Sequence, residues 1–154
     1  MTSGDMVASE AEAAVRRFRE SDPSMEKFFR SSFGYAVYPK VSKGGAGIGA
    51  AHGDGVVYEQ GALIGDSELT QVSLGFQLGG QTYSQIVFFE NKSVLDIFKK
   101  GNLEFSAQAS AIAAESGAGA ANDFESGVAV FTLPRGGLMF EAAIGGQGFS
   151  FRPR

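Results

Sequence analysis

The sequence predicts an α+β fold, in which N-terminal helices and one mid-chain helix cover a strongly curved antiparallel β-sheet or barrel. Its 154 residues are 44% hydrophobic and 19% charged, which is enough apolar material for the core of one ordinary domain. The 22 glycines and 14 phenylalanines favour short, turn-rich strands over a helix bundle. The expected elements also run as helices, strands, one helix and more strands, without the βαβ alternation of a parallel sheet.

Two helices are expected at the N-terminus. Residues 5–20 place Val7, Ala11, Ala14, Val15 and Phe18 at helical spacing on one face. Asp22 followed by Pro23 is typical of a helix start, with Asp22 as N-cap, and predicts a second short helix that ends near Ser31.

The first group of strands follows Gly34. Alternation of apolar and polar side chains is clearest from Thr70 to Leu78, which predicts a half-buried strand. Gly79 and Gly80 then fit a tight turn. The strands expected in this group are 35–38, ended by Pro39, then 55–59, 70–78 and 81–90.

The second half begins with a helix and returns to strands. Asn91 can cap a helix that runs to Lys100 and stops at Gly101. Residues 103–113 are ambiguous, because alanine prefers helix, but the period-two alternation favours a strand. A small-residue loop is expected at 116–125, and strands are expected at 128–133, 138–144 and 147–151.

The residues that most enzymes and metal sites require are scarce. The chain has no cysteine and a single histidine, His52, which is interpreted as a loop residue, so no metal site is expected. The segment from Gly45 to Ala50 fits G-x-G-x-x-A, yet it lacks the preceding strand and following helix of a dinucleotide site, so a β segment is favoured. We therefore expect no catalytic residue and no cofactor.

Charge is distributed unevenly along the chain. The net charge of −4 argues against a nucleic-acid partner. Residues 54–90 hold five acids and no base, whereas Lys43 precedes two glycines whose backbone N–H groups could help to hold phosphate. The alternative is that the basic residues solubilise the helices and pair with neighbouring acids, and the sequence alone favours this interpretation.

Several blocks resemble the SYLF domain family. The run from Phe33 to Val41, followed by Lys43-Gly44-Gly45, resembles the opening signature of that family. The resemblance continues through residues 70–81, 86–89 and 137–142 in family order. It covers nearly the whole chain from about Phe28, so we expect a helical extension at 1–27 and a SYLF-like domain at 28–154.

The resemblance implies a non-enzymatic lipid-binding module that contacts anionic phospholipid or phosphoinositide head groups at a membrane surface. The alternative is a carrier that holds an apolar ligand inside the barrel. The expected lipid-contact residues are Lys40 and Lys43, ahead of Arg16, Arg17 and Arg19, because no acid lies between Glu26 and Asp54.

The family also bears on location and assembly. This chain resembles the stand-alone bacterial members, which are often exported lipoproteins. We therefore expect a membrane-anchored monomer in the periplasm, made from a precursor whose signal peptide is absent from this sequence; a cytoplasmic location stays open. No protein partner is indicated.

Overall fold

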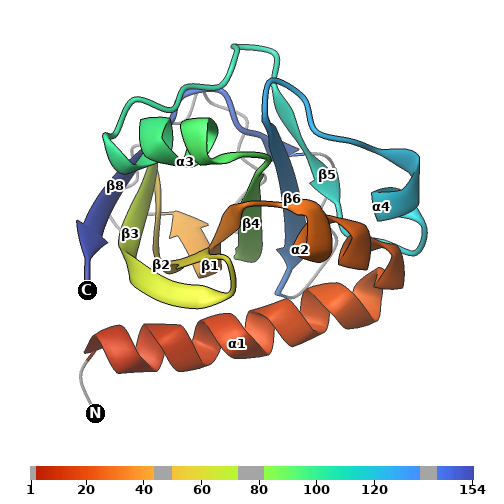
Figure 1. Ribbon diagram of the computed structural model, residues 1–154, viewed down its shortest axis with the longest axis horizontal. Coiled ribbons are helices and arrows are strands. Elements are labelled where there is room, and N and C mark those ends of the chain that lie inside the picture. The colour runs from red at the N-terminus through yellow and green to blue at the C-terminus, as the bar shows by residue number, and fades with distance from the viewer. Residues whose placement is uncertain (1–2, 44–49, 73–81, 136–141) are drawn as a thin grey trace.

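The computed structural model describes residues 3–43, 50–72, 82–135 and 142–154, and it has the expected α+β class (Figure 1). The helices are α1 (Ser3–Ser21), the 3-10 helix η1 (Pro23–Met25), α2 (Glu26–Ser31), α3 (Lys92–Lys99) and α4 (Ala118–Ala121). The strands are β1 (Gly34–Lys43), β2 (Ala50–Glu59), β3 (Ala62–Val72), β4 (Tyr83–Phe89), β5 (Ser110–Ala113), β6 (Val128–Pro134), β7 (Ala142–Ala143) and β8 (Gln147–Pro153). Within this described part, no helix combines the length and the apolar character needed to cross a membrane.

The strands form one curved sheet in the order β7-β5-β6-β4-β1-β2-β3-β8. Neighbouring strands are antiparallel except β5 and β6, which run parallel. The two outer strands, β7 and β8, are connected by only residues 144–146, so the sheet curves strongly enough to bring its ends together. No backbone pairing joins them in the described residues, so of the two predicted forms, a strongly curved sheet or a barrel, the structure has the curved, open sheet.

Helix α1 lies along the outer face of the sheet (Figure 1). Its apolar side chains and those of η1 and α2 pack against residues of β1, β2, β4 and β6, which buries one hydrophobic cluster. The helical members of this outer cluster are Ala11, Ala14, Val15, Phe18, Met25 and Phe28. The apolar stripe expected from helical spacing is therefore used to hold α1 on the sheet.

The inner face of the sheet carries a cluster of aromatic side chains. The ring of Phe149 lies 5.8 Å from that of Tyr38 and 5.6 Å from that of Phe98, and Phe98 lies 4.7 Å from Phe89, measured between ring centroids. Helix α3 supplies Leu95 and Phe98 to this inner cluster. Aromatic rings from β1, β4, β8 and α3 thus occupy the concave side of the sheet.

Three glutamines add a buried polar network to this interior. Gln85 and Gln147 exchange two side-chain hydrogen bonds of 2.8 and 2.9 Å. Gln147 also donates to Gln71 Oε1 at 3.2 Å, and Gln71 donates to the carbonyl of Ala143 at 2.8 Å. The network links β4, β8, β3 and β7, so it ties together the two ends of the open sheet.

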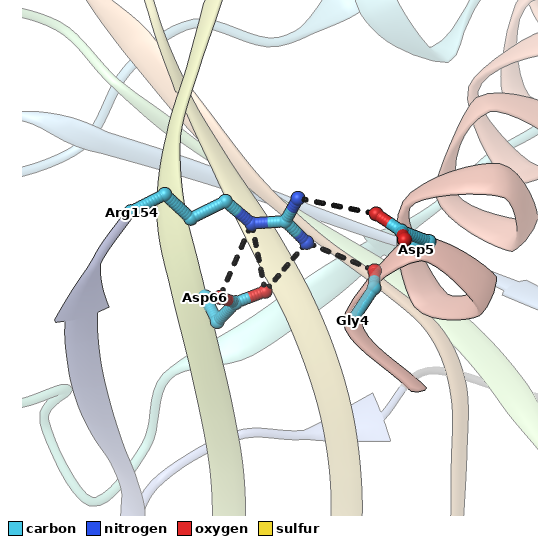
Figure 2. Close-up of polar contacts among 4 residues, drawn as sticks. All are labelled: Gly4, Asp5, Asp66 and Arg154. Carbon is cyan, nitrogen blue, oxygen red and sulfur yellow. Dashed lines mark hydrogen bonds and ion pairs between the residues drawn. The ribbon is translucent and has the colours of Figure 1, made fainter. Parts of the chain in front are cut away.

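Both termini of the chain meet at one side of the molecule. Figure 2 shows Arg154, the last residue, between Asp66 of β3 and the first turn of α1. Its guanidinium donates to Asp66 at 2.9 Å and to the carbonyl of Gly4 at 2.9 Å, and it lies 3.9 Å from Asp5. The C-terminus therefore anchors the beginning of α1 to the sheet.

The predicted helix starts are confirmed. Asp22 accepts a hydrogen bond from the Ser24 backbone N–H, and Pro23 opens η1. Asn91 accepts one from the N–H of Val94 at the start of α3. Both caps satisfy a backbone donor within three residues, which explains why sequence alone could find them.

Several predicted boundaries were wrong. Pro39 does not end β1, because a β-bulge carries the strand past it to Lys43. Residues 103–109 form no strand: 106–109 make a turn closed by the hydrogen bond from the Ala109 N–H to the Ser106 carbonyl, and its backbone packs on Gly145, so only 110–113 is β-structure. The expected loop at 116–125 contains the short helix α4.

Strand β3 begins well before its predicted start. Gln60 and Gly61 both have positive φ, as in a two-residue hairpin turn, and this turn joins β2 directly to β3. The expected β character after Ala50 is therefore confirmed in β2 and β3, while residues 44–49 lie outside the described part. The parts of the predicted strands and turns at 73–81 and 138–141 also lie outside it.

Candidate surface anion-binding site

A bulge at Pro39 creates an unusual point in the central strand β1. The registers with β2 and β4 shift between Val37 and Ser42 and between Tyr38 and Val41, respectively. Proline has no backbone N–H, so it fits inside a central strand only where the ladder is interrupted. At the bulge, the Pro39 carbonyl is available to accept hydrogen bonds from side chains.

Two side chains bond to this carbonyl. Ser84, buried in β4, donates its hydroxyl at 2.8 Å, and Arg135 donates from Nη1 at 3.2 Å. Arg135 directly follows β6, and its backbone N–H donates to the carbonyl of Thr82 beside β4. The strand order β6-β4-β1 therefore places Arg135 next to the bulge.

Helix α1 adds a second guanidinium at the same place. Nη2 of Arg17 lies 3.5 Å from Ser84 Oγ, the hydroxyl that bonds to Pro39. Lys40 follows Pro39 and is exposed. We refer to Arg17 and Arg135, grouped around Ser84 and the Pro39 carbonyl, together with the neighbouring residue Lys40, as the arginine site.

The electrostatics of the arginine site favour an anion. Burial lowers the pKa of Arg17 below its ordinary value, and the charges of Arg135 and Arg16 lower it further, while Glu10 and Glu20 oppose the shift. No carboxylate lies within 4.0 Å of the three cationic groups in the described part of the chain. A bound anion would relieve the repulsion between the two guanidinium groups.

The residues predicted for lipid contact are not all in one place. Arg17 and Lys40 belong to the arginine site, and exposed Arg16 adjoins Arg17 in α1. Arg19 instead pairs with Glu26 at 3.0 Å and lies over the ring of Phe29. Lys43 ends β1, but its side chain lies outside the described part.

Sequence reasoning missed Arg135. Its backbone bonds to Thr82 and its side chain to Pro39, which is 96 residues away, so no local pattern could reveal either contact. One signal was present: Arg135 precedes Gly136-Gly137, as Lys43 precedes Gly44-Gly45. Both are basic residues at the start of a glycine pair that follows a strand.

His52 is also placed differently from expectation. It lies within strand β2 and not in a loop, because β2 begins at Ala50. Its Nε2 atom is 3.3 Å from Glu68 Oε1 on β3 and 3.8 Å from Asp54 Oδ1.

An open, strongly curved sheet, helices on both of its faces and a cluster of cations with no ion-pair partner among the described residues define an α+β module with a candidate anion-binding surface. The family described as "Ysc84: Las17-binding protein actin regulator" matches residues 70–153, more than half of the chain. The chain belongs to this Ysc84 family, the SYLF domain family.

The chain is also similar to a longer bacterial protein, Beta cell expansion factor A from Aeromonas veronii. The two are 25% identical over 138 residues, which cover 89% of this chain and 52% of the relative. This chain thus spans about half the length of that curated relative. The predicted boundary between a helical extension at 1–27 and a SYLF-like domain at 28–154 stays a prediction.

Proposed function

We propose that this protein is a non-enzymatic module that binds anionic phospholipid or phosphoinositide head groups at a membrane surface through the arginine site. One observation carries the proposal: Arg17 and Arg135 converge on Ser84 and the Pro39 carbonyl without a carboxylate partner in the described residues. Guanidinium groups bind phosphate oxygens through paired N–H donors, and Lys40 would add a third positive charge. Membership in the SYLF family fits a lipid-binding or actin-regulator module.

The packing of α1 favours surface contact over insertion. Ala11, Ala14 and Phe18 are fully buried against the sheet, so the apolar face of α1 is not available to a bilayer. Binding through exposed cations alone is electrostatic and weakens as salt screens it.

The interior bears on the carrier hypothesis in two ways. The inner cluster brings Tyr38, Phe89, Phe98 and Phe149 into ring contact, and the glutamine network lies among the same strands. A carrier needs a cavity on this side of the sheet to bury most of its ligand. In the described part of the chain, a cavity of about 920 Å³ lies beside this cluster, lined by residues of 103–113, 121–126 and β6 and by Ile144, so the carrier alternative stays open.

Co-sedimentation with vesicles tests the proposal. The protein should sediment with phosphatidylcholine vesicles that contain phosphatidylserine or a phosphoinositide, and ~1 M salt should release it. Arg17→Gln combined with Arg135→Gln should weaken binding at least tenfold, since each basic residue near an anionic surface contributes about 1 kcal/mol. Glutamine keeps much of the side-chain length and removes the charge.

A charge-matched control separates the site from net charge. Arg30→Gln combined with Arg152→Gln removes the same two charges from exposed positions outside the arginine site. This control should bind within about twofold of the parent protein. Equal binding to pure phosphatidylcholine vesicles, or equal losses in the two double variants at unchanged melting temperature, would contradict the proposal.

The prediction that Lys40 and Lys43 contribute more to lipid contact than the arginines of α1 can be tested in the same assay. Lys40→Ala combined with Lys43→Ala is expected to weaken binding roughly tenfold or more. If that variant binds like the parent while the arginine variant does not, the guanidinium pair and not the lysines carries the contact.

A further inference from the structure

Three potential metal ligands share the outer face of the hairpin formed by β2 and β3. Ala51 belongs to the inner cluster, so the alternation of side chains places His52 and Asp54 on the opposite face. Glu68 is the direct register partner of Asp54 across the two strands. One ligand atom from each of the three residues lies within 4.8 Å of the other two.

The pairing of Asp54 with Glu68 needs an explanation. Two like charges directly opposite each other on antiparallel strands destabilise the sheet. In the described part of the chain, the basic group within 4.0 Å of these carboxylates is the imidazole of His52. A divalent cation held between the three side chains would balance the two carboxylate charges.

The spacing of the donor atoms suits coordination. A metal with bonds of about 2.1 Å holds its ligand atoms roughly 3.0–3.4 Å apart in octahedral or tetrahedral geometry. Nε2 of His52 lies 3.3 Å from Glu68 Oε1 and 3.8 Å from Asp54 Oδ1. The side chains of His52, Asp54 and Glu68 are 48%, 59% and 43% exposed, so a small rotation could close the longer distance and an ion could enter.

The geometry points to a binding site for a divalent transition-metal ion of the Zn²⁺ class, formed by His52, Asp54 and Glu68. One imidazole nitrogen with two carboxylate oxygens favours such an ion over Ca²⁺ or Mg²⁺, which prefer oxygen ligands alone. Three protein ligands leave further coordination positions to water or to another molecule. The two ligands on β2 and the one on β3 are held in register by the strand pairing.

The composition of the chain makes the test specific for a single imidazole. It has one histidine and no cysteine, so imidazole coordination can come only from His52. Zn²⁺ titration followed by calorimetry should show saturable binding to the unmodified protein. NMR of the single imidazole ring should show its signals shift in proportion to occupancy. Cu²⁺ bound at the same site should show nitrogen coupling in its electron paramagnetic resonance spectrum.

Substitutions then distinguish the three-ligand site from weaker contacts. His52→Ala should weaken Zn²⁺ binding at least tenfold and abolish the nitrogen coupling. Asp54→Asn and Glu68→Gln should each weaken binding several-fold. The matched controls Asp123→Asn and Glu104→Gln remove the same charges from exposed positions elsewhere and should leave the affinity unchanged.

Three outcomes would overturn the site. The first is a lack of saturable Zn²⁺ binding together with imidazole signals that do not respond to the metal. The second is unchanged affinity in His52→Ala. The third is loss of binding in His52→Ala alone, with both carboxylate variants unaffected. The ring signals are read in the unmodified protein, so the proposal remains testable even if a variant folds poorly. No membrane enters this test, so its result is independent of the proposed lipid binding.

Discussion

Asp22 and Gly119 are joined by a hydrogen bond of 2.6 Å across 97 residues of sequence. The Asp22 carboxylate, fully buried, also accepts from the backbone N–H groups of Ser24 and Gly117 and from the Ser24 hydroxyl. One side chain thus caps η1 and fixes the segment that contains α4 against it. Burial alone would raise the pKa of Asp22, but the hydrogen bonds from Ser24, Gly119 and Gly117 outweigh it and lower the pKa.

Asp22→Asn should reduce the free energy of unfolding at pH 7 by about 1–3 kcal/mol, because an amide replaces one acceptor oxygen and leaves a backbone N–H unpaired. A carboxyl with a lowered pKa stabilises the fold above its unfolded pKa, and this contribution is lost as pH falls through the folded pKa. The parent should therefore lose stability below about pH 3.8, the ordinary value for Asp, more steeply than the variant. Urea unfolding at a series of pH values measures both effects.

Glu20→Gln supplies the control for this experiment. Glu20 is an exposed carboxyl near the end of α1, two residues before Asp22, so its substitution should change stability little at any pH. Equal acid sensitivity of the parent and Asp22→Asn would show that the hydrogen bonds to Asp22 do not lower its pKa in solution.

Gly119→Ala should destabilise the protein by about 1–3 kcal/mol through overpacking. A Cβ atom at this position would lie 2.7 Å from the backbone of Ser24 and Met25, which cannot yield as a flexible side chain could. Gly148→Ala is the matched comparison, because its Cβ would meet Thr70 Oγ1 at an ordinary 3.6 Å. Thermal unfolding should rank Gly119→Ala well below Gly148→Ala, and the reverse order would disprove the predicted contact.

The glutamine network should behave as one cooperative unit. Gln85→Leu leaves the buried amide of Gln147 without two of its hydrogen bonds, so we expect a loss of about 1–3 kcal/mol. Gln147→Leu should cost a similar amount, but the double variant should cost less than the sum of the two, since no unpaired partner remains in that pair. Urea denaturation of the four proteins of this cycle measures the coupling, and simple additivity would rule it out.

The sequence by itself determined the α+β class, the two capped helix starts and the family. These features depend on local signals: Asp22 and Asn91 cap helices whose first turns follow at once, and apolar spacing marks one face of α1. The family blocks are likewise continuous runs of residues. The expected export as a membrane-anchored lipoprotein remains a prediction.

Only the tertiary structure decided which distant residues meet. Arg17 and Arg135 reach one hydroxyl and one carbonyl because β6, β4 and β1 are neighbours and α1 lies across them. His52 approaches Glu68 because a two-residue turn at Gln60 and Gly61, together with a register shift between Val57 and Tyr58, sets the pairing of β2 with β3. Residue spacing along the chain specifies a helix face or a strand face, but strand order, register and curvature arise from packing of the whole sheet, and these bring the site residues together.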